Sequence, residues 1–83
     1  MEVAAQVSLY PLRQPRLSSV IEAALAVFRE HQLQVTPGSM STIVSGDYDR
    51  MFDAFKQAFR ETAEQGEIVM VVTVSNACPI GGD

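Results

Sequence analysis

The chain has 83 residues, a net charge of −4 and one cysteine, which predicts a single domain over residues 1–83. A chain this short buries only about 60–65% of the surface that its unfolded form exposes, so it needs additional stabilisation. One cysteine excludes an internal disulfide, and a single histidine beside it excludes a closed zinc site of four nitrogen and sulfur ligands. We therefore expect no metal, and a homodimer or homotetramer.

Charge and hydropathy limit the classes of molecule that the chain is expected to bind. The six basic residues are spread along the chain and do not form the cluster that nucleic acids or anionic membrane surfaces require. Wholly apolar runs such as residues 68–72 are far too short to span a membrane. No basic segment followed by an apolar run opens the chain, so we expect no signal peptide. These features predict no nucleic-acid partner, no membrane insertion and a cytoplasmic location.

The first half of the chain predicts a strand and a helix. Apolar residues alternate over residues 3–9, and Pro11 ends that pattern because proline cannot donate to a strand ladder. Ser19 and Glu22 have the spacing of a capping box at a helix start. The helix should end near residues 31–32. Its apolar stripe follows helical spacing at Val20, Ile21, Ala24, Leu25 and Phe28.

The second half predicts two strands, a helix and a last strand. Residues 33–36 and 40–45 form the strands, joined by a turn at Pro37 and Gly38. Asp47 is the expected N-cap of the second helix, and Gly66 suits a left-handed position after it. Residues 68–75 form the last strand. The second helix should bury Met51, Phe52, Phe55, Ala58, Phe59 and Thr62.

The order β-α-β-β-α-β predicts the α+β class and a ferredoxin-like sandwich. Its antiparallel sheet would have the strand order 4-1-3-2, with both helices on one face. The core should span about residues 3–76, with residues 77–83 as a C-terminal tail. The other side of the sheet, the helix-free face, would carry Gln6, Ser8 and Tyr10 mixed with apolar groups of the last strand. Such a mixed face is expected to pack against a second subunit.

Three segments together carry a resemblance to a known family. They are VSLYPL at residues 7–12, MSTIVSG at residues 40–46, and GEIVM running into TVSNACP at residues 66–79. In this order they resemble the YkoF-like thiamine/hydroxymethylpyrimidine-binding family over residues 7–79. The resemblance implies a ferredoxin-like domain that binds thiamine or its hydroxymethylpyrimidine moiety, without catalysis, in thiamine or precursor uptake or salvage.

This chain departs from the family members that carry two such domains in tandem. A homodimer or homotetramer would have to supply the packing surface of the second domain. The number of ligand sites, and whether an interface forms them, therefore stays open. No other cofactor is expected. Glycine-rich sequence occurs only at residues 81–82, so no phosphate cradle is visible and an unphosphorylated ligand is favoured.

The candidate ligand-binding residues are small hydroxyl side chains and one tyrosine. The resemblance points first to Ser41 and Thr42, whose alternative role is that of ordinary strand hydroxyls, and the sequence does not say which of the two points inward. Tyr10 could stack on a pyrimidine ring or pack in a subunit interface. The remaining candidates, which could equally be satisfied sheet hydroxyls, are Ser8, Thr73 and Ser75.

No catalytic residue is predicted. Cys78 lacks a nearby base, because the only histidine, His31, lies at the end of the first helix. Two other classes remain as alternatives. One is a small ferredoxin-like enzyme, either acylphosphatase-like with Arg13 or Arg16 at an anion, or of the dimeric α+β-barrel type. The other is a regulatory domain that senses a ligand or binds a partner protein.

Overall fold

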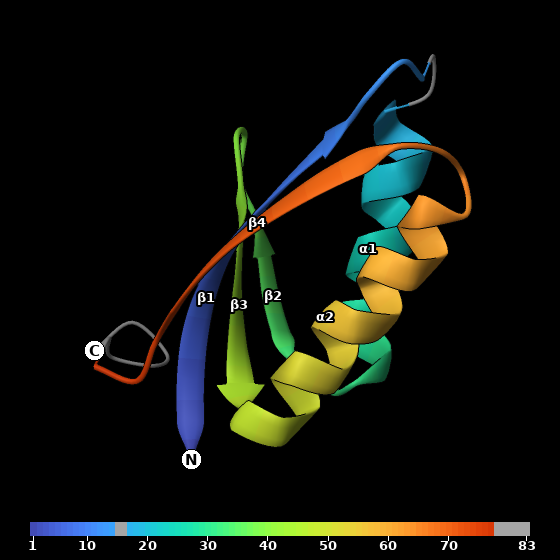
Figure 1. The fold of residues 1–83 in the computed structure, drawn as a ribbon. Coiled ribbons are helices and arrows are strands. Elements are labelled where there is room, and N and C mark those ends of the chain that lie inside the picture. Colours follow the sequence, from blue (N-terminus) through green and yellow to red (C-terminus); the bar gives the residue numbers. More distant parts are fainter. Residues whose placement is uncertain (15–16, 78–83) are drawn as a thin grey trace.

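The computed structural model describes residues 1–14 and 17–77. Within them the elements follow the order β-α-β-β-α-β (Figure 1): β1 (Glu2–Pro11), α1 (Leu17–Glu30), β2 (Gln34–Pro37), β3 (Thr42–Asp47), α2 (Tyr48–Ala63) and β4 (Ile68–Ser75). The strands form one antiparallel sheet in the order β2-β3-β1-β4, which is the predicted order in the opposite direction. The ferredoxin-like prediction is confirmed.

The core lies between the sheet and the two helices, which sit on one side of it in Figure 1. Alternation along β1 places Val3, Ala5 and Val7 against the helices, each at most 3% exposed. Their neighbours on the other parity, such as Gln6 and Tyr10, are exposed on the helix-free face. A strand's side chains point alternately to its two faces, so one burial pattern fixes which residues remain for the other face.

The second helix begins as the sequence predicted, and the first does not. The Oδ2 atom of Asp47 accepts a hydrogen bond from the backbone N–H of Arg50 at 3.1 Å, which confirms Asp47 as the N-cap of α2. The capping box predicted at Ser19 is wrong. The chain is already helical at Leu17, so Ser19 lies inside the first turn of α1 rather than ahead of it.

The buried stripe of α2 is narrower than predicted. Phe52 and Phe59 were expected in the core, but each is 46% exposed. At 3.6 residues per turn these two side chains lie on a flank of the helix, beside the stripe that faces the sheet. The buried positions of α2 are Met51, Ala54, Phe55, Ala58 and Thr62.

Gly66, which follows α2, has a positive φ. It does not adopt the left-handed helical conformation that the sequence predicted. Its φ is 149°, whereas a left-handed helical residue has φ near +57°. A Cβ atom at this position would also lie 2.8 Å from the Cδ atom of Gln14. Glycine is therefore favoured here by its dihedral angle, whereas the Gln14 side chain could move aside for a Cβ atom.

No helix in residues 1–14 and 17–77 combines the length and apolar character needed to cross a bilayer. The predicted tail, including Cys78, lies outside the described residues from position 78 onward, and so does Arg16.

Candidate functional site

The sheet is open at one end of β1. Beside β4, β1 remains paired up to Pro11, but beside β3 its pairing ends where Val7 meets Thr42. Residues 38–41 connect β2 to β3, and the N–H of Gly38 closes this loop by donating to the carbonyl of Ser41 at 2.9 Å. Beyond Val7, β1 therefore has no strand beside it on the β3 side.

A cavity of about 100 Å³ lies at this open end. We call it the hydroxyl cavity, because Ser8, Ser41 and Thr42 contribute to its lining. Its apolar wall comes from α1, and Met40, which is 89% exposed, stands in the loop at its margin. The side chains of the α1 wall are Ile21, Leu25 and Phe28.

Ser41 and Thr42 lie on opposite sides of the sheet. The Oγ atom of Ser41 accepts a hydrogen bond from the Nε2 atom of Gln6 at 3.2 Å, on the helix-free side. Thr42 pairs with Val7, whose side chain faces the helices. Both residues still border the hydroxyl cavity, because it opens where β3 begins and the two sides of the sheet meet. The sequence left this orientation undecided, and the strand register decides it.

The hydroxyl groups of this cavity are available to a guest. Across residues 1–14 and 17–77, Ser8 and Thr42 make no side-chain hydrogen bond within the protein. Ser41 uses its oxygen as an acceptor for Gln6 and keeps its own proton to donate. The site can thus offer both donors and acceptors beside an apolar wall.

The other three predicted residues lie elsewhere, on the helix-free face. Tyr10 is opposite Val69 and is 51% exposed, while Thr73 is opposite Gln6. The Oγ atom of Ser75 accepts a hydrogen bond from the N–H of Ala77 at 3.0 Å, which fastens the turn after β4. None of the three borders the hydroxyl cavity. The structure therefore divides the six predicted residues into two groups of three.

Sequence reasoning missed the α1 wall of the cavity. Ile21, Leu25 and Phe28 were assigned to the core stripe because they recur at helical spacing. No local signal separates them from the core residues of α1, since core and cavity residues on one helix recur with the same periodicity. They could be assigned to the cavity only after the start of β3 at Thr42 was known.

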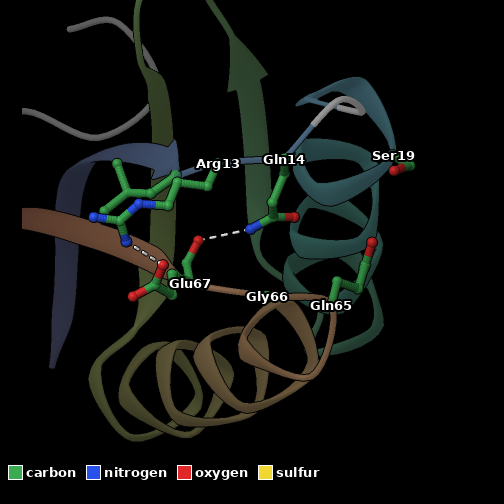
Figure 2. Close-up of a pocket in the computed structure, with 7 residues that line it drawn as sticks. Arg13, Gln14, Ser19, Gln65, Gly66 and Glu67 are labelled. Atoms are coloured by element: carbon green, nitrogen blue, oxygen red, sulfur yellow. Dashed lines mark hydrogen bonds and ion pairs between the residues drawn. The ribbon is translucent and has the colours of Figure 1, made fainter.

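A second, larger hollow of about 630 Å³ lies between the β1–α1 loop and the turn from α2 to β4. Figure 2 shows Arg13, Gln14 and Glu67 on one side of it and Ser19 and Gln65 at the helices. We call it the Arg13 cleft. Here a cavity and a basic side chain of the β1–α1 loop meet, as the acylphosphatase-like alternative would require.

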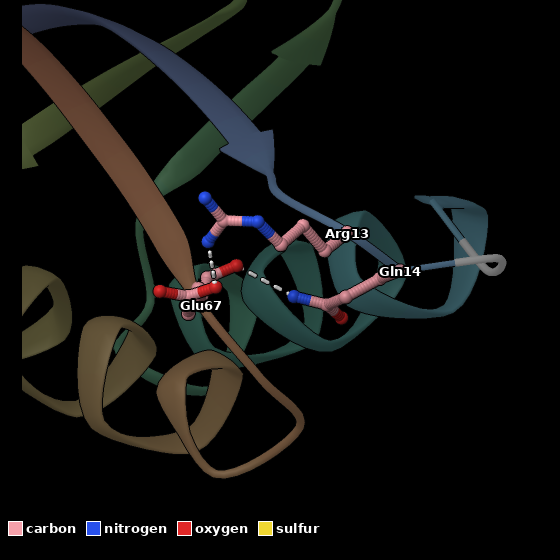
Figure 3. Close-up of polar contacts among 3 residues, drawn as sticks. All are labelled: Arg13, Gln14 and Glu67. Atoms are coloured by element: carbon pink, nitrogen blue, oxygen red, sulfur yellow. Dashed lines mark hydrogen bonds and ion pairs between the residues drawn. The ribbon is translucent and has the colours of Figure 1, made fainter.

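Polar groups on one side of the Arg13 cleft are engaged in contacts to Glu67. Arg13 forms an ion pair with the carboxylate of Glu67, and the Nε2 atom of Gln14 donates to the backbone carbonyl of Glu67 at 2.6 Å (Figure 3). The N–H of Leu12 donates to the same carbonyl at 2.9 Å. An anion in this cleft would have to compete with the carboxylate for Arg13. The arrangement therefore favours a structural clasp over an anion site.

His31 is also engaged in a side-chain contact. Its Nε2 atom lies 2.8 Å from the Oε1 atom of Gln57, which joins the end of α1 to α2. In the part of the chain that the structure describes, no three His, Cys, Asp or Glu side chains gather at a spacing that could hold a metal ion.

The chain is similar in sequence to proteins of a known family. The model of the YKOF-related family matches residues 2–81. The chain belongs to this family. UPF0045 protein MJ1052 from Methanocaldococcus jannaschii is 36% identical over 58 residues, which are 69% of this chain. Those residues are 58% of that relative, so the match spans less than two thirds of its length.

Solved structures show the same fold. The crystal structure of MJ1052 matches with a TM-score of 0.84 at 28% identity, covering 93% of this chain and 81% of the other. TM0486 from Thermotoga maritima, described as a candidate thiamine biosynthesis/salvage protein, matches with a TM-score of 0.83 at 19% identity. That match covers 96% of this chain and 91% of the other. The family resemblance carried by the three sequence segments is confirmed.

Proposed function

We propose that this chain reversibly binds thiamine or its hydroxymethylpyrimidine moiety, without turning it over, in thiamine or precursor uptake or salvage. Membership of the YKOF-related family supports the proposal, as does the shared fold of a Thermotoga maritima protein described as a candidate in thiamine biosynthesis or salvage. The observation that carries it is the hydroxyl cavity, where Ser8, Ser41 and Thr42 meet the apolar wall of α1.

The chemistry of an aminopyrimidine matches this cavity. The ring is flat and carries both hydrogen-bond donors and acceptors, so it needs an apolar surface for its face and polar groups for its edge. Ile21 and Leu25, which are not fully buried, supply the apolar surface, and the hydroxyls with the unpaired edge of β1 supply the polar groups. No strong base is needed, because binding breaks no bond.

The size of the cavity favours one ring. Its volume of about 100 Å³ is below the roughly 300–1,000 Å³ of pockets that enclose drug-sized ligands. The pyrimidine would occupy it, and the thiazolium of thiamine would extend past Met40 into solvent. A diphosphate would find no glycine-rich cradle at this end of the sheet, so unphosphorylated species are the proposed ligands.

A homodimer or homotetramer through the helix-free face belongs to the same proposal. Large apolar side chains there are between 43% and 51% exposed, at Tyr10, Ile43, Val69 and Val71. A second subunit on this face would cover them and would bring Tyr10, Thr73 and Ser75 into a shared interface. Those three residues would then form a second group of contacts near the ligand.

Calorimetric titration with hydroxymethylpyrimidine and with thiamine tests the proposal. Thr42→Val keeps the shape of the side chain and removes the hydroxyl, so we expect the Kd to rise roughly two- to tenfold, the effect of one lost hydrogen bond. Thr36→Val is the matched control, because Thr36 is exposed on β2 and does not line the cavity. Mass spectrometry should recover the ligand unchanged after incubation.

The two groups of predicted residues give different outcomes. A loss of affinity in Thr73→Val with none in Thr42→Val would move the site to the helix-free face. No heat and no thermal shift from either compound at millimolar concentration would refute thiamine-related binding altogether.

A further inference from the structure

Two hydrogen bonds at the ends of β1 fix the direction in which each of its backbone groups points. The N–H of Leu12 donates to the carbonyl of Glu67 at 2.9 Å, in line with the β1–β4 register. The N–H of Tyr48 donates to the carbonyl of Met1 at 2.9 Å, in line with the β1–β3 register. In an antiparallel sheet the N–H and C=O of one residue point to the same neighbour, and successive residues alternate. Even-numbered residues of β1 therefore bond toward β4, and odd-numbered residues bond toward β3.

This alternation leaves the backbone groups of Leu9 without a strand beside them. They point to the β3 side, where the ladder ends at Val7. Continued by two residues, the register would set Met40 opposite Leu9, but the chain there has turned into the loop between β2 and β3. The next odd-numbered residue, Pro11, has no N–H. On this stretch of β1, beyond Val7, Leu9 is thus the residue that offers both a donor and an acceptor.

The free pair of backbone groups belongs to the wall of the hydroxyl cavity. Leu9 lines that cavity together with Ser8 and the loop residues Ser39 and Met40. Leu9 is half-buried, and a buried backbone N–H or C=O without a partner costs free energy comparable to a lost hydrogen bond. The cavity therefore presents a donor and an acceptor that the fold holds in place and that β3 does not satisfy.

We propose that the main chain of Leu9 recognises the ligand by an amino group and the ring nitrogen next to it. The N–H of Leu9 donates to the ring nitrogen, and its C=O accepts from the amino group. This inference rests on the proposed function and names the ligand class of the same site: single heteroaromatic rings with an amino group beside a ring nitrogen. Such a ring takes the place that the next residues of β3 would occupy.

The direction of these hydrogen bonds also orients the ring. Hydrogen bonds to a carbonyl lie near its plane, and the carbonyl of an edge residue points outward in the plane of the sheet. A ring bonded to Leu9 therefore extends the sheet and turns one face toward α1, where Ile21 and Leu25 line the cavity. A ring with an oxo group and a protonated nitrogen carries the donor and acceptor in the reverse order. It can satisfy Leu9 only after turning over, which displaces its other substituents.

Hydrogen exchange of single amides, followed by NMR on the whole chain, tests the geometry. Without ligand the amide of Leu9 should exchange rapidly, whereas those of Ser8 and Tyr10 on the same strand, which point to β4, should exchange slowly. With hydroxymethylpyrimidine at ten times its Kd, exchange at Leu9 should slow by about tenfold. A Leu9 amide that is as protected as those of Ser8 and Tyr10 in the free chain would overturn the proposal.

Calorimetry with two analogues of hydroxymethylpyrimidine tests the recognition. One carries a methyl group in place of the amino group, and the other carries C–H in place of the adjacent ring nitrogen. Each analogue leaves one backbone group of Leu9 unpaired, so each Kd should rise by about tenfold or more. If the pyrimidine binds and both analogues bind equally well, or the Leu9 amide stays unprotected, this recognition is wrong and the proposed function stands. If neither the pyrimidine nor thiamine binds, the proposed function fails and this inference fails with it.

Discussion

The two faces of the sheet are made from the same strands but differ in burial: one face forms the core under the helices, and the other is exposed. In β3, Val44 is fully buried under the helices, while its neighbour Ile43 is 46% exposed on the helix-free face. The alternation that places one set of side chains in the core also places the residues between them on the helix-free face, where they do not contribute to the core. Assembly and recognition can change on that second set without loss of the core.

At the open end of β1, residues from both faces of the sheet border the same cavity. Ser41 and Thr42 belong to opposite faces, yet both border the hydroxyl cavity because β3 begins there. The candidate site thus lies where pairing stops and both sides of the sheet are accessible. A ligand at this position could contact the apolar wall of α1 and the hydroxyls of both sides at once.

The largest expected effect is a loss of stability when an acidic residue replaces Val44 on the helix-covered face, in contrast to the same change at its neighbour Ile43. Val44→Asp would bury an unpaired carboxylate in the core, at an effective cost of several kcal/mol, which is a large share of the roughly 5–15 kcal/mol that stabilises a small domain. We expect this variant to be largely unfolded by circular dichroism. Ile43→Asp should keep the fold, since its carboxylate stays in water.

Thermal unfolding of both variants at low concentration separates the fold from assembly. If Ile43→Asp unfolds the isolated monomer as completely as Val44→Asp does, the helix-free face is part of the core and the division between the faces is incorrect.

The sequence predicted the fold because local signals agreed with one another. Alternation in residues 3–9, the N-cap at Asp47 and proline after the first strand each pointed to the same element order. The errors came where packing decides. Phe52 and Phe59 follow helical spacing, but whether a flank is covered depends on the width of the sheet beneath it, which no local pattern encodes.

The site was only partly predictable for a related reason. The resemblance pointed to Ser41 and Thr42, but the cavity that they border exists because β3 begins only at Thr42, opposite Val7, while β1 continues to Pro11. Relative strand ends are a tertiary property. Ile21 on α1 could not be assigned to the cavity wall without them, and Tyr10 could not be separated from it.

Gly46 should show the next largest effect, because it lies on the helix-covered side of β3. Its φ is 153°, and a Cβ atom there would lie 2.7 Å from the Cδ2 atom of Leu33. We expect Gly46→Ala to reduce the free energy of unfolding by about 1–3 kcal/mol through backbone strain and overpacking. Ser45→Ala, one residue earlier on the helix-free face, is the control and should change it by less than about 0.5 kcal/mol. Urea denaturation of both would contradict this account if the two losses were equal.

Asp47 should show a smaller effect at the start of the helix that covers β3 and β4. Asp47→Ala removes the acceptor for the N–H of Arg50, and losing an N-cap costs about 1 kcal/mol. Asp47→Ser keeps a capping oxygen and should restore most of the stability, as measured by thermal or urea unfolding. If serine were no better than alanine, the contribution of Asp47 would have to be electrostatic, through the helix dipole, and not through the hydrogen bond.

The smallest expected effect concerns the contacts that Arg13 and Gln14 in the β1–α1 loop make with Glu67, just before β4. Arg13 and Glu67 are 78% and 63% exposed, so solvent screens their ion pair, and such surface pairs contribute about 0–1 kcal/mol. Arg13→Gln should therefore lower stability only slightly, and less in high salt than in low salt. Gln14→Ala removes a bond to the backbone carbonyl of Glu67 and should be less sensitive to salt. The reverse ranking, a large salt-independent loss in Arg13→Gln, would mean that Arg13 stabilises the β1–α1 loop by packing and not by its ion pair with Glu67.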